Sequence, residues 1–184
     1  FWSKHKRTNF DWWRKRFKRQ FELVDLLRLD HFRGLSGYWR VSGNYKTAIC
    51  GKWINSPGRT LLKKLKKDLG DNYLPIIAED LGVITQDVEK LREDFELPGM
   101  KILQFAFDGK EDNPYLPKNI EGENWVVYTG THDNSTSLSW WECLDENSKI
   151  RIKDVYEFSE NPSWSLIKIG MDTDANLFIA PIQD

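Results

Sequence analysis

Hydrophobic residues near the start of the chain recur at the spacing of an amphipathic helix. Trp13, Phe17, Phe21 and Val24 follow one another at steps of four, four and three residues, which places them on one face. The other face of this predicted helix, residues 11–25, is basic. We expect a solvated helix face rather than a nucleic-acid site, because the net charge is −1 and no nucleic-acid-binding motif accompanies the basic residues.

Five short apolar runs follow, and most of them lack the polar/apolar alternation of a half-exposed strand. Continuous apolar runs are typical of parallel strands that are covered on both faces. The predicted strands are Leu26–Leu29, Leu74–Ala78, Lys101–Phe107, Trp125–Tyr128 and Asn176–Pro181. The predicted helices between them are residues 60–69, 85–95, 135–158 with an interruption, and 163–171, while 33–59 and 108–124 are predicted loops.

This order of helices and strands predicts an α/β fold built from successive βα units. Unusual polar residues follow the strands, as in an α/β barrel, whose site lies at the carboxyl ends of its strands. An open doubly wound sheet is the competing fold. It would usually carry a Gly-rich phosphate turn, whereas Gly34 and Gly37 follow a strand without a third glycine or a helix. Thr85 is the expected N-cap of the 85–95 helix.

Composition narrows the classes of function. Lys and Arg number 27 and Asp and Glu number 28, so no overall attraction for polyanions is indicated. No apolar run approaches the ~20 residues of a membrane span, so we expect no membrane as partner. Because the charge is balanced, we expect no nucleic acid as partner either. Cys50 and Cys143 form no disulfide framework or metal-binding pattern, which suits a reducing cytosol. Aromatic residues make up 14% of the chain, and stacking on sugars is the functional alternative to core packing.

Three carboxylates stand at the ends of predicted strands. Asp30 and Glu79 end the first and second apolar runs, and Asp133 comes shortly after the Trp125–Tyr128 run. In a barrel, all three would point into one mouth. Cleavage of a glycosidic bond with retention needs a nucleophilic carboxylate and a protonated carboxyl group ~5–5.5 Å apart. A third carboxylate can hold sugar hydroxyls. The three carboxylates together therefore favour retaining cleavage of a glycosidic bond.

The neighbours of these acids fit the same interpretation. Arg28 and Asp30 point to the same side of a strand, so the guanidinium could keep the carboxylate ionised and aimed. Glu79 follows four apolar residues, and desolvation there would favour the protonated form that an acid catalyst needs. His31 and His132 adjoin two of the acids, where they could be structural hydrogen-bonding groups or donors to a sugar hydroxyl. No zinc site is expected, because no two histidines have the spacing of metal ligands.

Four motifs carry a resemblance to a known family. They are Leu-Arg-Leu-Asp-His-Phe-Arg-Gly-Leu at 27–35, Ile-Ala-Glu-Asp-Leu-Gly-Val-Ile-Thr at 77–85, Pro-Gly-Met-Lys-Ile-Leu-Gln-Phe-Ala-Phe at 98–107 and Tyr-Thr-Gly-Thr-His-Asp-Asn at 128–134. With these motifs the chain resembles the 4-α-glucanotransferases of glycoside hydrolase family 77, also called amylomaltases or disproportionating enzymes. The similarity runs in order along essentially the whole chain.

The resemblance implies a retaining, double-displacement transfer of α-1,4-glucan segments to glucose or maltooligosaccharide acceptors. Asp30 would be the nucleophile, Glu79 the general acid/base and Asp133 the transition-state stabiliser. No cofactor and no metal are implied, because the carboxylates supply the covalent and proton chemistry. The alternatives are an α-glucan hydrolase of the α-amylase clan and an inactive glucan-binding fragment that relies on aromatics such as Trp39 and Trp53.

The resemblance also implies four substrate-binding residues and a fold. Arg28 would position the nucleophile, His132 would bind hydroxyls of the transferred sugar, and His31 and Asn134 match motif positions. The five predicted strands correspond to strands four to eight of a TIM (β/α)8 barrel. We therefore expect residues 1–184 to be the C-terminal part of a catalytic barrel, truncated at both ends and of uncertain activity on its own. The expected location is the cytoplasm, or a plastid in a plant.

Overall fold

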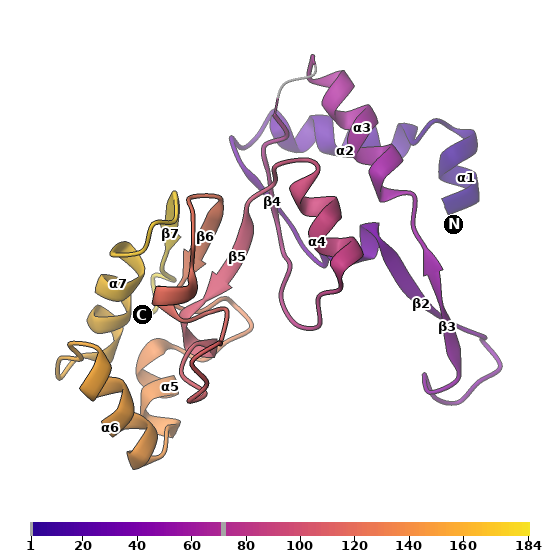
Figure 1. Ribbon diagram of the computed structural model, residues 1–184. Coiled ribbons are helices and arrows are strands. Elements are labelled where there is room, and N and C mark those ends of the chain that lie inside the picture. Colours follow the sequence, from indigo (N-terminus) through magenta and orange to yellow (C-terminus); the bar gives the residue numbers. More distant parts are fainter. Residues whose placement is uncertain (1, 71–72) are drawn as a thin grey trace. The chain divides into compact units, whose positions relative to one another are not determined.

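The computed structural model describes residues 2–70 and 73–184. The chain divides into two compact units, Phe1–Gly99 and Met100–Asp184 (Figure 1). The first unit contains α1 (Trp2–Arg7), α2 (Asp11–Phe21), β1 (Leu27–Leu29), the 3-10 turn η1 (Phe32–Leu35), β2 (Gly37–Val41), β3 (Gly51–Asn55), α3 (Gly58–Asp68), β4 (Ile76–Ala78) and α4 (Gln86–Glu93). The second begins within β5 (Gly99–Ile102) and contains η2 (Leu103–Phe105), η3 (Pro117–Asn119), β6 (Trp125–Tyr128), α5 (Ser137–Cys143), α6 (Glu146–Val155), α7 (Pro162–Met171) and β7 (Leu177–Ile179).

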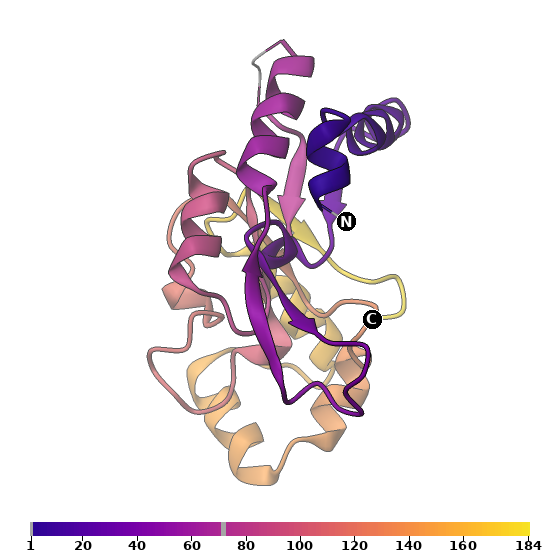
Figure 2. The same ribbon diagram turned by 90° about the vertical axis from the view of Figure 1, so that its right-hand side faces the viewer.

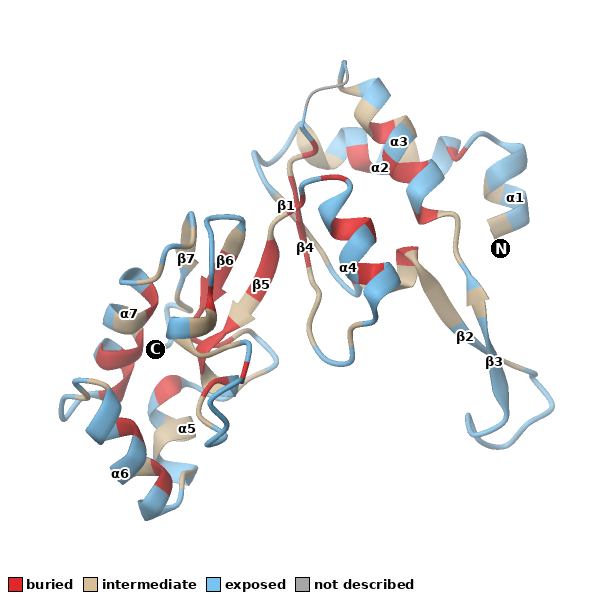
Figure 3. Ribbon diagram, in the orientation of Figure 1, coloured by how far each residue is buried: buried red, intermediate tan, exposed pale blue. Residues whose placement is uncertain are grey.

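A parallel pair of short strands forms the centre of the first unit. β1 and β4 lie side by side, with Leu27 opposite Ile76 and Leu29 opposite Ala78. All three residues of β4 are buried, as Figure 3 shows, because helices and loops cover this strand. A strand made of Ile-Ile-Ala without alternation is what such burial requires. The pair therefore sets the positions of the residues that follow each strand.

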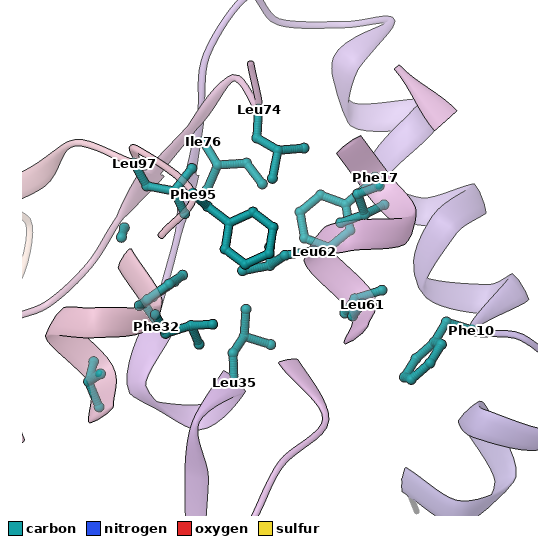
Figure 4. Close-up of a cluster of buried hydrophobic side chains, with 14 residues drawn as sticks. Phe10, Phe17, Phe32, Leu35, Leu61, Leu62, Leu74, Ile76, Phe95 and Leu97 are labelled. Atoms are coloured by element: carbon teal, nitrogen blue, oxygen red, sulfur yellow. The ribbon is translucent and has the colours of Figure 1, made fainter. Parts of the chain in front are cut away.

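The core of this unit joins the helices to the strands. Phe17 of α2 and Leu61, Leu62 and Leu65 of α3 are buried in one cluster with Ile76 of β4 (Figure 4). These side chains come from the apolar stripes that the helical spacing predicts. Burial of such side chains from water is the main force that packs the elements together.

One ion pair also links α2 to α3. Arg14 donates from Nε and Nη2 to the two carboxylate oxygens of Asp68, and both distances are 2.6 Å. This two-point contact holds the pKa of the Asp68 carboxyl below its ordinary value, mainly through the hydrogen bonds from Arg14. The basic face of α2 is otherwise largely exposed to solvent, as predicted.

The structure corrects the end of one predicted helix, and it places Thr85 at the predicted N-cap without the expected side-chain bond. Helix α2 ends at Phe21 rather than at residue 25, so Val24 lies outside the helix and is exposed. Thr85 occupies the N-cap position of α4 but makes no capping hydrogen bond from its side chain. Its side chain instead bonds the carboxylate of Asp87, which also accepts a hydrogen bond from Ser36 and has a lowered pKa for these reasons.

The segment predicted as the loop 33–59 contains an antiparallel hairpin. β2 and β3 pair along their whole length, with Trp39 opposite Trp53. The hairpin extends beyond the N-terminal end of α3 in Figures 1 and 2. Its residues are exposed or only half-buried, so the segment has no continuous apolar run by which the sequence could identify it.

The second unit is built on a three-stranded sheet with the order β5–β6–β7. β6 and β7 are parallel, with Val126 opposite Leu177 and Tyr128 opposite Ile179. The predicted interruption of the 135–158 helix is confirmed, because α5 ends at Cys143 and α6 begins at Glu146. The predicted strand 101–107 is too long, since the chain turns into a 3-10 helix after β5.

The mixed α/β fold is confirmed, whereas a barrel is not seen. Within residues 2–70 and 73–184 the strands form separate sheets of two, two and three strands, and none of these sheets closes. No helix within these described ranges is long and apolar enough to cross a membrane. Cys50 and Cys143 are both exposed and free.

Candidate active site

Asp30 and Arg28 form the ion pair that their spacing predicts. Arg28 Nη2 lies 2.9 Å from Asp30 Oδ1, and the Asp30 side chain is 73% exposed. Arg28 lies in β1 and Asp30 directly follows it, so both side chains project to one side of the strand. The guanidinium thus holds an accessible carboxylate at the carboxyl end of β1.

The parallel pairing brings Glu79 to the same end of the sheet as Asp30. Leu29 and Ala78 are register partners, so the residue after each is one of the two acids. The Glu79 N–H donates to the Leu29 carbonyl at 3.1 Å, which continues the ladder past the end of β4. A pair of carboxylates at one end of a sheet can supply both a nucleophile and a general acid/base.

Two backbone N–H groups hold the Glu79 carboxylate. The His31 N–H donates to Oε2 at 2.6 Å, and the Leu81 N–H donates to Oε1 at 3.1 Å. In return, the Glu79 carbonyl accepts from the Phe32 N–H at 3.1 Å. The side chain is therefore oriented by the loop after β1 as well as by its own loop.

The backbone at His31 is in the left-handed region, with φ at 51°. A residue with a Cβ pays roughly 1–2 kcal/mol for this conformation. His31 lies between Asp30 and the η1 turn, and in this conformation its N–H donates to the Glu79 carboxylate. Strain of this kind, maintained by the surrounding contacts, is common at functional sites.

The third predicted acid lies in the loop between β6 and α5 of the second unit. Asp133 is exposed, and its Oδ1 lies 3.4 Å from Nε2 of the equally exposed His132. Asn134 has a local role, because its Oδ1 accepts from both the N–H and the hydroxyl of Thr131 at 2.8 Å. The turn that these bonds form carries the His-Asp pair at its tip.

Gln104 is a contributor to this loop that the sequence did not single out. Its Nε2 donates to the Ser135 carbonyl at 3.0 Å, and its N–H donates to the Thr129 carbonyl at 3.2 Å. A Cβ at Gly130 would come within 2.8 Å of Gln104 Nε2, so a larger residue there would require the Gln104 side chain to move. In the sequence, Gln104 could have been recognised only from its position inside the motif at 98–107.

The structure thus brings the predicted residues together in two groups. Arg28, Asp30, His31 and Glu79 meet at the end of the β1–β4 pair, and His132, Asp133 and Asn134 share the β6–α5 loop. Among the residues that the structure describes, no group of three His, Cys, Asp or Glu side chains could hold a metal ion.

A protein-family model described as 4-alpha-glucanotransferase matches residues 1–184 of this chain. The chain belongs to the 4-alpha-glucanotransferase family. It is 47% identical over 185 residues to a 4-alpha-glucanotransferase of Synechocystis, covering 100% of this chain and 36% of that protein. It is 43% identical to the chloroplastic/amyloplastic 4-alpha-glucanotransferase of Arabidopsis thaliana, with 100% and 32% covered.

A solved structure gives the same result. The amylomaltase from Streptococcus agalactiae in complex with acarbose is 37% identical to this chain, with a TM-score of 0.89. The similarity covers 99% of this chain and 37% of that one. This member of the 4-alpha-glucanotransferase family therefore spans about a third of the length of the relatives that it matches.

The hairpin aromatics considered for glucan binding have partners within the first unit. Trp39 Nε1 donates to the Ala48 carbonyl at 2.8 Å, and its ring meets that of Trp53 edge-on at 5.7 Å. The Arg33 guanidinium lies 4.7 Å from the centre of the Trp53 ring. These contacts give the two tryptophans a structural role in this family member, although both remain partly exposed.

Proposed function

We propose that this chain carries the catalytic acids of a retaining 4-α-glucanotransferase. The observation that carries the proposal is the position of Asp30 and Glu79, which follow register partners of adjacent parallel strands. Family membership supports it, because the motifs that match the family contain both acids. The roles of the individual residues are the part that experiments must test.

In the first step Asp30 attacks the anomeric carbon of an α-1,4-glucan while Glu79 protonates the leaving oxygen. Arg28 keeps the Asp30 carboxylate ionised and aimed at the sugar. The shortened glucan departs and leaves a glycosyl-enzyme ester. Asp133 and His132 hold hydroxyls of the transferred sugar as its ring flattens toward an oxocarbenium ion.

In the second step Glu79, now a carboxylate, removes the proton from the 4-hydroxyl of an acceptor. The acceptor is glucose or a maltooligosaccharide, and it displaces Asp30 with net retention. Transfer exceeds hydrolysis only where water is excluded or poorly placed. The two carboxylates supply all the proton and covalent chemistry of both steps.

We also propose that β1, β4, β5, β6 and β7 correspond to strands four to eight of a (β/α)8 barrel, of which residues 1–184 form the C-terminal part. The coverage of the relatives supports a partial barrel, because this chain matches about a third of their length. The proposed location is the cytoplasm, or a plastid if the protein comes from a plant. The Arabidopsis relative is named as chloroplastic/amyloplastic.

The test uses the full-length protein with maltotriose as both donor and acceptor. Glucose together with longer oligosaccharides is the expected outcome, and Asp30→Ala should abolish it. An increase in reducing ends without longer products would instead assign an α-glucan hydrolase. Binding of maltooligosaccharides without turnover, unchanged by Asp30→Ala, would assign a glucan-binding protein.

A second variant tests the acid role of Glu79 specifically. Glu79→Gln should slow transfer from glucans by about 100-fold or more, because the leaving oxygen then lacks a proton donor. Formation of the glycosyl-enzyme from α-maltosyl fluoride, whose leaving group needs no proton, should be much less affected. Equal loss with both donors would contradict the assignment of Glu79 as the acid.

A further inference from the structure

The loop that carries Asp133 is attached to the second unit at both of its ends. Thr129, which follows β6, and Ser137, which begins α5, are fully buried at 0% exposure. Between them the side chains of His132 and Asp133 are 71% and 76% exposed. The direction of an exposed carboxylate on a loop depends on what holds the ends of that loop.

One carboxylate bonds both ends. Asp184 Oδ2 accepts from the Thr129 hydroxyl at 2.5 Å and from the Ser137 hydroxyl at 2.8 Å. Asp184 Oδ1 accepts from the Ser137 N–H at 2.8 Å. Bonds to a charged acceptor are stronger than neutral ones, so this acid is a firm link between the end of β6 and the start of α5.

The position of Asp184 follows from the topology of the sheet. β7 lies parallel to β6, with Tyr128 opposite Ile179, so the segment after β7 returns to the end of β6. At the start of α5 the Thr136 side chain accepts from the Ser139 N–H, and Asp184 adds a bond from the Ser137 N–H. The bond to Thr129, on a different element, has no function in capping.

We propose that Asp184 is a positioning residue for the β6–α5 loop and holds Asp133 in the place where it stabilises the transition state. The inference rests on the proposed function of Asp133. Asp184 acts indirectly, through its hydrogen bonds with Thr129 and Ser137 at the two ends of the loop. A displacement of about 1 Å at a catalytic group can cost about 100-fold in rate, so loss of this link should affect catalysis.

The test is a double-mutant cycle in the full-length protein. Asp184→Ala should lower kcat and kcat/KM for maltotriose by the same factor, about 10- to 100-fold, as expected for an interaction made only in the transition state. In an Asp133→Asn background, the same change should cost no more than about twofold. α-Maltosyl fluoride keeps the rates of the Asp133→Asn proteins measurable, and the cycle is repeated with this donor.

Three further variants separate positioning from stability. Asp184→Asn keeps an acceptor for the Ser137 N–H and should fold, with a smaller loss of kcat. Thr129→Val removes the hydroxyl that donates to Asp184 with little change of side-chain shape, and it should also lower kcat. Asp145→Ala is the matched control, because Asp145 accepts from the N–H and hydroxyl of Ser148 at the start of α6. It should lower Tm and leave kcat unchanged.

The outcomes distinguish this inference from the function on which it rests. Equal losses from Asp184→Ala in both backgrounds, or a lower Tm with normal kcat in Asp184→Asn and Thr129→Val, would overturn the positioning role. Retention of full transfer activity by Asp133→Asn would overturn the proposed role of Asp133 and the inference with it. Loss of transfer in Asp30→Ala would leave the glucanotransferase assignment standing in either case.

Discussion

At the scale of single residues, the candidate site depends on backbone groups as much as on side chains. Asp30 is aimed by Arg28, as the strand spacing predicts, but Glu79 is held by the N–H groups of His31 and Leu81. The sequence singles out these two acids as candidates because they follow apolar runs. It could not identify His31 as a backbone donor, because that role depends on a left-handed turn and a pairing across the sheet.

The left-handed backbone at His31 leads to a prediction about which substitutions are tolerated. Asn adopts positive φ more readily than β-branched residues, so His31→Asn should keep the turn while His31→Val should strain it. We expect His31→Val to lower kcat on maltotriose by about tenfold or more, because the N–H would leave Glu79. With α-maltosyl fluoride, the loss should be smaller.

The comparison between the two variants decides the role of His31. A backbone role predicts that His31→Asn retains most of the activity. If His31→Asn and His31→Val lose activity equally on both donors, the imidazole itself contacts the sugar and the backbone role is wrong. Tm measured for each variant accounts for any loss of folded protein.

At the scale of elements, the continuous apolar runs located β1, β4, β5, β6 and β7, with errors only at the ends of the strands. The β2–β3 hairpin was missed because its strands pair with each other and remain largely exposed. Gly37 and Gly51 at its ends also resemble loop residues in the sequence. Asp68 and Asp184 each link two elements that are distant in the sequence. Residue spacing cannot predict such long-range contacts.

The contact between α2 and α3 should make stability depend on pH. The pKa of Asp68 is lowered from its ordinary value of 3.8 by Arg14, so the carboxylate stabilises the fold above about pH 4. This contribution is lost as the pH falls through the lowered pKa of the folded state. Asp68→Asn should therefore reduce the free energy of unfolding at pH 7, by no more than about 1 kcal/mol because the pair is partly exposed.

Chemical denaturation of the full-length protein at pH 7 and near pH 2.5 measures this difference. At the lower pH, wild type and Asp68→Asn should approach equal stability. In an Arg14→Gln background, Asp68→Asn should have little effect at either pH. A pH-independent difference between wild type and Asp68→Asn would show that the ion pair is not its cause.

The packing of α7 against β7 requires glycine at position 170. A Cβ there would come within 2.2 Å of the Phe178 ring, so the ring or the helix must move. Gly170→Ala should lower the free energy of unfolding by about 1–3 kcal/mol through overpacking, despite the better helix propensity of alanine. Gly43→Ala is the control, because nothing lies within 4 Å of its Cβ position. Equal stability of the two variants would contradict the packing argument.

At the scale of the whole molecule, the described strands form small sheets, whereas a closed (β/α)8 barrel needs eight strands. The chain spans about a third of the length of its relatives. The predicted catalytic residues occur on both compact units, with Asp30 and Glu79 on one and Asp133 on the other. The proposed mechanism therefore uses residues of both units.

This leads to a prediction about residues 1–184 expressed alone. They should disproportionate maltotriose at least about 100-fold more slowly than the full-length protein, because the barrel proposed above needs strands in addition to those of the described sheets to position its strand ends. Product analysis by chromatography measures the rate, and circular dichroism shows whether the polypeptide is folded. Comparable rates for the two proteins would mean that the sheets seen here suffice for catalysis.

The two free cysteines have a practical consequence for spectroscopy. Cys50 lies in the hairpin of the first unit, Cys143 ends α5 in the second, and both are exposed. A donor dye on one thiol and an acceptor dye on the other would report the distance between the two units by energy transfer. Glucan titrated into the labelled protein would then show whether the units move relative to each other while the sugar is held.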